Sequence, residues 1–173
     1  MSDADKLVAD AIDALQAKMA KDGLPRFHDA RMAVVHAALR LNDQDVEHLV
    51  GYWLDRQQRL IGVETLATGG VAEVSFSRRE ITRRTLLSGA AEVILLHNHP
   101  SGDARPSAAD TEMAGMLDRA LASVGVMVAG HFIVAAEGYA DVRAGTTFTW
   151  AEIKGNDAPV EVPRCPHCHG PLE

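Results

Sequence analysis

Two continuous apolar segments, HLVGYWLD (48–55) and AEVILLHN (91–98), most strongly constrain what this chain can fold into. Strands of this composition are typically buried, so other elements must cover the sheet that contains them. The pattern predicts helices at 28–41, 77–89 and 107–125, on either side of these strands in the sequence. We therefore expect an α/β domain with a central sheet and helices on both faces.

The other expected elements divide the chain into three parts. An amphipathic helix at 3–21 and the helix at 28–41 would form a short helical N-terminal extension, residues 1–44. The domain itself would span 45–145, and a polar tail with a Cys/His cluster would occupy 146–173. Further strands within the domain are expected at 60–67, 71–76 (after a Gly69-Gly70 turn), 126–135 and 138–144.

Composition narrows the classes of function. Apolar residues make up 47% of the 173 residues, enough for a packed core. The net charge of -7 argues against nonspecific coating of nucleic acid, which needs a basic face, although a local basic patch is compatible with it. The chain shows neither a secretory signal nor a membrane-spanning run, and its two cysteines lie together near the end. These features predict a cytoplasmic protein that does not enter membranes.

The stretch LLHNHPSGDARPSAAD (95–110) carries the chemistry. Alternate side chains of a strand point the same way, so His97 and His99 can face one metal ion. A loop with Gly and Pro leads to a helix that Ser107 would cap, and Asp110 lies in its first turn. Two imidazoles and one carboxylate leave a fourth position open, as in catalytic zinc sites. An isolated His-x-His pair is usually two ordinary histidines, and the carboxylate strengthens the prediction.

This stretch resembles the JAMM motif of JAB/MPN-domain metalloenzymes, and most closely its RadC branch. His97, His99, Ser107 and Asp110 match the motif with its spacing. The resemblance covers about residues 45–145 and includes YWLDRQQRLIGVETL, VSFSRREITRRTL and GHFIVAAEGYADVR. It implies a JAB/MPN-like mixed sheet, related to the cytidine-deaminase fold, with helices on both faces.

The resemblance also implies a role for each matching residue. His97, His99 and Asp110 would bind Zn²⁺, and the Ser107 hydroxyl would hydrogen-bond the oxyanion formed on the attacked carbonyl. An upstream glutamate would move a proton from the zinc-bound water to the leaving amine. Alignment with the RadC pattern assigns this role to Glu64, although an alternating strand could point its side chain to solvent. Glu73 and Glu47 are the alternatives.

The chain departs from the RadC pattern at three places outside the predicted metal ligands. Gly130 stands where an Asp usually precedes the histidine of the penultimate strand, Ser77-Arg78 replaces His-Pro, and Gly70 replaces a Thr. The helix-hairpin-helix region of long RadC proteins is also not evident in the first forty-odd residues. These departures affect the expected substrate contacts and weaken a DNA-binding role.

Three further features remain open. Four arginines at 78, 79, 83 and 84 could meet phosphates or an acidic partner, or could be ordinary solvated side chains. His131, in an apolar strand, could be a core histidine or a neighbour of the metal. The tail could bind a second, structural zinc ion, or could be a flexible segment with two reactive thiols; its candidate ligands are Cys165, His167, Cys168 and His169.

The leading hypothesis is therefore a zinc-dependent hydrolase of amide or isopeptide bonds, acting on a peptide or an isopeptide-linked protein. The main alternative is a RadC-like accessory factor of DNA repair that binds nucleic acid and has no peptidase activity. A third is a metal-binding scaffold without turnover, which would not need both Ser107 and Glu64. The sequence identifies neither the substrate nor the oligomeric state.

Overall fold

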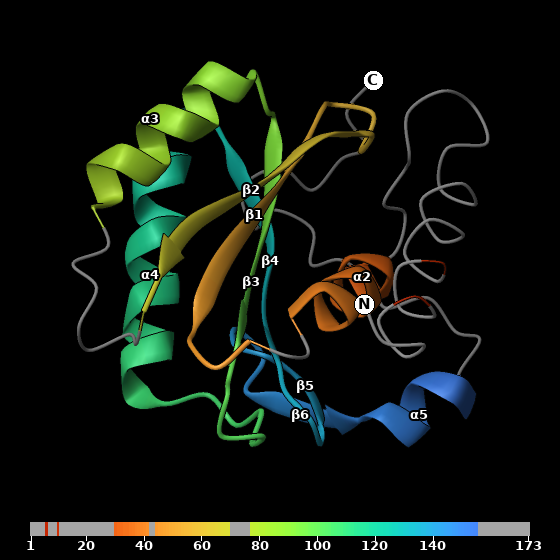
Figure 1. Cartoon of the computed structure of the whole chain (residues 1–173). Helices are drawn as coiled ribbons and strands as arrows, with labels where there is room; N and C mark the ends of the chain where they lie inside the picture. Colours follow the sequence, from red (N-terminus) through yellow and green to blue (C-terminus); the bar gives the residue numbers. More distant parts are fainter. Residues whose placement is uncertain (1–5, 7–9, 11–29, 42–43, 70–76, 156–173) are drawn as a thin grey trace.

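A six-stranded mixed sheet forms the centre of the computed structural model (Figure 1), which describes Lys6, Asp10, 30–41, 44–69 and 77–155. The strands are β1 (His48–Leu54), β2 (Leu60–Thr68), β3 (Glu92–Asn98), β4 (Met127–Val134), β5 (Gly138–Asp141) and β6 (Thr146–Thr149). Their order across the sheet is β2-β1-β3-β4-β5-β6. Only the pair β3 and β4 is parallel among these neighbours. The predicted α/β class and mixed sheet are confirmed.

Four described helices accompany the sheet. They are α2 (Ala30–Leu41), α3 (Arg78–Ser88), α4 (Ala108–Ala122) and α5 (Trp150–Gly155). Figure 1 shows α3 and α4 on one face of the sheet and α2 on the other. The expectation of helices on both faces is therefore confirmed, and α2 matches the helix predicted at 28–41.

Alternation along β1 and β3 separates two cores. One set of side chains packs under α2 and includes Tyr52, Ile94 and Leu96. The side chains between them in sequence pack under α3 and α4, and they include Trp53 and Leu95. Every residue of β3 is buried, because β3 lies inside the sheet and both of its faces are covered. The end of β3 is thus held firmly where the predicted site begins.

Local signals set the ends of the helices. The Ser77 hydroxyl accepts a hydrogen bond from the Glu80 N–H at the start of α3, and Gly89 ends that helix with φ 72°. Ser107 and Asp110 form a reciprocal capping box at the start of α4, which places Asp110 in its first turn. The sequence predicted Ser107 as the cap of this helix, and the structure confirms it.

The structure differs from the expected elements at the end of the sheet. Residues 146–149 form β6, which pairs with β5, where the sequence pattern predicted the beginning of a polar tail. Phe148 stacks on Tyr139 at a ring-centroid distance of 4.8 Å, and Trp150 Nε1–H donates to the Ala135 carbonyl. These aromatic contacts hold the segment against the sheet despite its exposed threonines.

Two other expectations lie outside the described residues: the strand predicted at 71–76 falls there completely, and the helix predicted at 3–21 falls there apart from Lys6 and Asp10. Among the residues that are described, no helix has both the length and the apolar character needed to cross a bilayer.

One buried hydrogen bond links α2 to the sheet and makes stability depend on pH. His36 Nδ1 lies 2.7 Å from the Tyr52 hydroxyl, and both side chains are buried. Burial, together with the nearby charge of Arg40, lowers the pKa of His36 below its usual 6.5. As the pH falls below 6.5, the unfolded chain therefore takes up this proton before the folded chain does.

The contribution of His36 to the free energy of unfolding should consequently decrease from pH 7.5 towards pH 5, since protonation of this side chain favours the unfolded chain. His36→Gln should cost about 1–3 kcal/mol near pH 7.5, because the buried hydrogen bond between the imidazole and the Tyr52 hydroxyl is lost. The difference from wild type should shrink towards pH 5. Urea unfolding at several pH values measures this, and a difference that stays constant with pH would contradict the assignment.

Candidate metal centre

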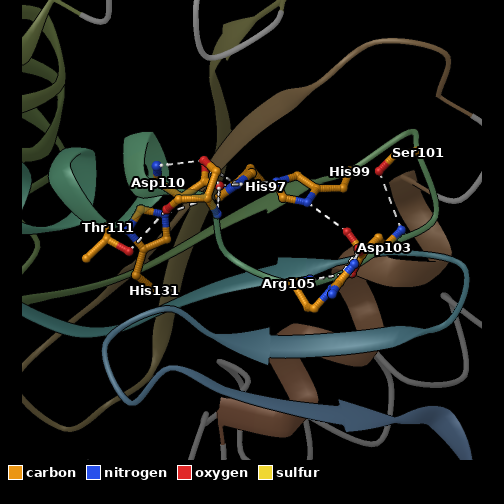
Figure 2. A network of polar contacts seen from close by, with 9 residues as sticks. His97, His99, Ser101, Asp103, Arg105, Asp110, Thr111 and His131 are labelled. Atoms are coloured by element: carbon orange, nitrogen blue, oxygen red, sulfur yellow. Dashed lines mark hydrogen bonds and ion pairs between the residues drawn. The ribbon is translucent and has the colours of Figure 1, made fainter.

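His97 and His99 project from the end of β3 towards the N-terminus of α4. His97 shares its face of the sheet with Val93 and Leu95, which pack under α3 and α4. The chain continues beside β4 for one more residue, since the His99 N–H donates to the Val134 carbonyl at 3.0 Å. Figure 2 shows the two imidazoles next to each other and close to Asp110. The strand thus delivers both histidines to one side, as the sequence predicts.

The start of α4 places the carboxylate. Asp110 is only 1% exposed, and its Oδ2 accepts hydrogen bonds from the Ser107 N–H at 2.7 Å and the Ser107 hydroxyl at 2.6 Å. Its other oxygen, Oδ1, is buried and accepts no hydrogen bond, although it lies 3.1 Å from His97 Nε2. A buried carboxylate oxygen without a hydrogen bond is costly unless a cation or proton meets it.

The distances within this group fit a metal ion. His97 Nε2 and His99 Nε2 lie 3.2 Å apart, and His99 Nε2 lies 3.5 Å from Asp110 Oδ2. In a tetrahedral zinc site with bonds of about 2.0–2.1 Å, neighbouring ligand atoms are about 3.3 Å apart. Within the described part of the chain, only these three residues form a group of His, Cys, Asp or Glu ligands close enough to share an ion. The spacing of these three side chains therefore suits a tetrahedral metal ion.

Electrostatics keep the carboxylate charged. Burial alone would raise the pKa of Asp110, but His97, His99 and Ser107 outweigh it and hold the pKa far below its usual range. Burial would likewise lower the pKa of His99, but Asp110, the Asp103 carbonyl and the charge of Glu47 together raise it. The site therefore attracts positive charge, either as protons on imidazole or as a metal cation.

The far nitrogen of each imidazole has a partner that orients the ring. His99 Nδ1 lies 2.8 Å from the Asp103 carbonyl, which can only accept, so this nitrogen carries the proton. His99 Nε2 is then left with a lone pair for a metal. His97 Nδ1 lies 3.4 Å from His131 Nε2 (Figure 2). Partners of this kind fix the tautomer and direction of metal-binding histidines.

His131 therefore lies beside the candidate metal ligands. Its side chain is fully buried in β4, and burial together with the neighbouring His97 lowers its pKa to about 3. Its Nδ1 has no hydrogen-bond partner among the residues that the structure describes. The sequence left open whether His131 is an ordinary core residue or a neighbour of the metal. Its contact with His97 favours the second alternative.

The Ser107 hydroxyl is engaged within the motif. It accepts from the Asp110 N–H at 3.2 Å and donates to Asp110 Oδ2. Ser107 therefore caps α4 and orients the carboxylate at the same time. Its expected role towards a substrate carbonyl stays a prediction.

Glu64 lies on β2, and the pairing of the strands places it away from the three candidate ligands. It pairs with Gly51 of β1, and Gly51 pairs with Leu95 of β3, two residues before His97. The Glu64 carboxylate is 2.9 Å from Arg84 of α3, and its side chain is 44% exposed. The ion pair with Arg84 is therefore enough to explain a charged side chain at Glu64, and no contact with the candidate metal centre is needed.

Glu47, an alternative in the sequence prediction, lies much closer to the centre. The antiparallel register pairs Leu49 with His97, and the same register counted two residues further, beyond the paired residues, would set Glu47 opposite His99. Burial lowers the pKa of His99, but Asp110 and the Asp103 carbonyl raise it, and the charge of Glu47 adds a smaller contribution in the same direction. The sequence named Glu47 only as an alternative to Glu64, and the strand register now favours it.

The other residues singled out in the sequence have different surroundings. Arg83 and Arg84 both form ion pairs with Glu80, at 2.7 Å and 2.9 Å, so part of the arginine cluster is neutralised within α3. Glu73 and the cluster of Cys165, His167, Cys168 and His169 lie outside the described residues.

Comparisons with known proteins find related sequences. A family model described as RadC-like JAB domain matches residues 27–146. A UPF0758 protein of Stenotrophomonas maltophilia is 46% identical over 95 residues, which are 55% of this chain and 41% of that protein. A UPF0758 protein of Dechloromonas aromatica is 45% identical over 97 residues, covering 56% and 43%. One of Nitrosospira multiformis is 41% identical over 120 residues, covering 68% and 50%. The chain thus spans half or less of these relatives.

Replacing His131 should weaken metal binding without removing a ligand. In His131→Phe an aromatic ring is kept in β4, but the hydrogen bond to His97 Nδ1 is lost. Loss of such a partner typically reduces metal affinity 10–100-fold, so we expect a reduction of about that size. Competition with a chromophoric chelator for Zn²⁺ or Co²⁺ measures it. His36→Phe, at a buried histidine under α2, is the matched control, and equal affinities in both variants would show that His131 only packs.

Proposed function

Because this chain belongs to the RadC-like JAB domain family, we propose that it is a zinc-dependent hydrolase of amide or isopeptide bonds. The observation that supports this most is the convergence of His97, His99 and Asp110 at the end of β3. Two nitrogens and one carboxylate oxygen are the donor set of a catalytic zinc, because they leave a position open for water or substrate. The UPF0758 relatives carry no activity in their names, so the reaction is argued from the site.

The fit of the residues to zinc rests on their chemistry. Imidazole and carboxylate ligands at these spacings suit a tetrahedral ion, and the unsatisfied Asp110 Oδ1 provides a buried negative charge. When bound, zinc supplies a water of lowered pKa and polarises the carbonyl that is attacked. The protein's part is to hold the three ligands, with Asp103 and His131 behind the two imidazoles.

Glu47 is the side chain that we assign to proton transfer. Its position opposite His99 puts a carboxylate at the side of the centre that β1 borders. There it can accept a proton from attacking water and pass it to the leaving amine. Glu64 remains the competing assignment from the sequence, but the strand register places it in line with Leu95, two residues before His97. The Ser107 hydroxyl, 2.6 Å from Asp110 Oδ2, would have to turn towards a substrate carbonyl to stabilise an oxyanion.

A nucleic-acid accessory role is the second candidate. The feature that favours it is the exposed start of α3, where Arg78 and Arg79 present positive charge at the surface. Their neighbours Arg83 and Arg84 are already paired with Glu80, which reduces the charge available for phosphates. With the chain's net charge of -7, this favours the hydrolase.

Replacing the two glutamates separates the assignments. In the zinc-loaded full chain, Glu47→Gln should reduce cleavage of fluorogenic peptide amides or lysine isopeptides about 10²–10⁴-fold, because general acid–base transfer contributes this much. Zinc content should stay unchanged. Glu64→Gln is the matched control and should retain most of the activity.

The reverse result, with Glu64→Gln inactive and Glu47→Gln active, would return the role to Glu64. If the zinc-loaded wild type cleaves no member of a broad peptide and isopeptide library, the hydrolase proposal fails. Salt-dependent retention of DNA that is lost in Arg78→Ala/Arg79→Ala would then support the accessory role.

A further inference from the structure

Asn98, the residue between the two histidines, makes contacts that the proposed reaction leaves unexplained. Because side chains alternate along β3, Asn98 lies on the face opposite His97. Its side chain is 4% exposed, so both ends of its carboxamide need hydrogen-bond partners. It finds them on the backbone of a segment 50 residues earlier in the chain.

The two hydrogen bonds of Asn98 lie on either side of Glu47. The His48 N–H donates to Asn98 Oδ1 at 2.7 Å, and Asn98 Nδ2 donates to the Val46 carbonyl at 3.0 Å. Regular pairing between β1 and β3 reaches Leu49 and His97 and does not extend to these residues. Beyond the last backbone pair, the Asn98 side chain thus supplies the hydrogen bonds that the two strands would otherwise make. It joins the start of β1 to the end of β3.

The segment is also held from its other side. The Gly69 N–H donates to the Glu47 carbonyl at 2.8 Å, and the Thr68 hydroxyl lies 3.1 Å from His48 Nδ1. These contacts fix the segment to β2, but neither links it to the strand that carries the histidines. The Asn98 side chain is thus a direct link between this segment and the end of β3.

We propose that Asn98 is a positioning residue that holds Glu47 opposite His99. The His-Asn-His sequence then has two functions: its outer residues offer metal ligands on one face, and its middle residue fixes the carboxylate from the other. The role of Glu47 in proton transfer rests on the proposed function, whereas the attachment of its backbone to Asn98 does not.

The test compares Asn98→Ala with variants of its partners in the zinc-loaded full chain. Amide hydrogen exchange, followed by NMR, should show the His48 N–H exchanging about tenfold faster in Asn98→Ala, because one buried hydrogen bond is lost. Asn98→Asp keeps the acceptor oxygen and should keep His48 protected. Thr68→Val removes a contact at the same end of β1 and is the matched control, with His48 exchange unchanged.

The second part of the test measures kcat, KM and zinc content in the same variants. We expect Asn98→Ala to keep its zinc and its KM while kcat falls to the level of Glu47→Gln. The double variant should fall no further, since both changes remove the same carboxylate from its position. Loss of zinc, or additive losses of kcat, would overturn the positioning role.

The two arms also separate this inference from the proposed function. Suppose that the wild type cleaves no substrate, while the His48 N–H still exchanges faster in Asn98→Ala. The hydrolase proposal then fails, and the attachment of the Glu47 segment to Asn98 stands. An unchanged His48 exchange rate in Asn98→Ala would overturn the inference, whether or not the protein is a hydrolase.

Discussion

Pairing between β1 and β3 is the constraint on which the rest of the candidate centre depends. It sets Leu49 opposite His97, and beyond this last pair the hydrogen bonds of Asn98 to Val46 and His48 hold the segment that contains Glu47. A shift by one residue would turn Glu47 to the face covered by α2 and separate it from the histidines. The apolar side chains of both strands, packed under α2 on one face and under α3 and α4 on the other, resist such a shift. Packing thus determines the chemistry that this edge of the sheet can offer.

The start of α4 offsets the energetic cost of burying a charged carboxylate. Asp110 is almost fully enclosed, yet its pKa is held low, because two imidazoles and the Ser107 hydroxyl outweigh the effect of burial. The same capping box that begins the helix therefore orients a metal ligand. Helix capping and site geometry cannot be varied separately here, since Ser107 and Asp110 serve both.

Local patterns predicted the parts of the site that lie within fourteen residues of one another. His97, His99, Ser107 and Asp110 follow from a strand, a loop and a capped helix, whose periodicities are visible in the sequence. The central sheet and its covering helices also follow from the apolar segments. Glu47, Asn98 and His131 could not be assigned in this way, because their roles depend on contacts across strands. β6 was missed because its stability comes from aromatic stacking against β5 and not from an apolar run of its own.

The central claim is that His97, His99 and Asp110 form a preorganised metal centre. The most direct test is a crystal structure of the full chain, given one equivalent of zinc, with anomalous difference maps from data above and below the zinc edge. The account predicts one strong peak within about 2.0–2.2 Å of His97 Nε2, His99 Nε2 and an Asp110 oxygen, absent in His97→Ala/His99→Ala crystals grown in the same way. A zinc-containing crystal with no peak among these three side chains would contradict it.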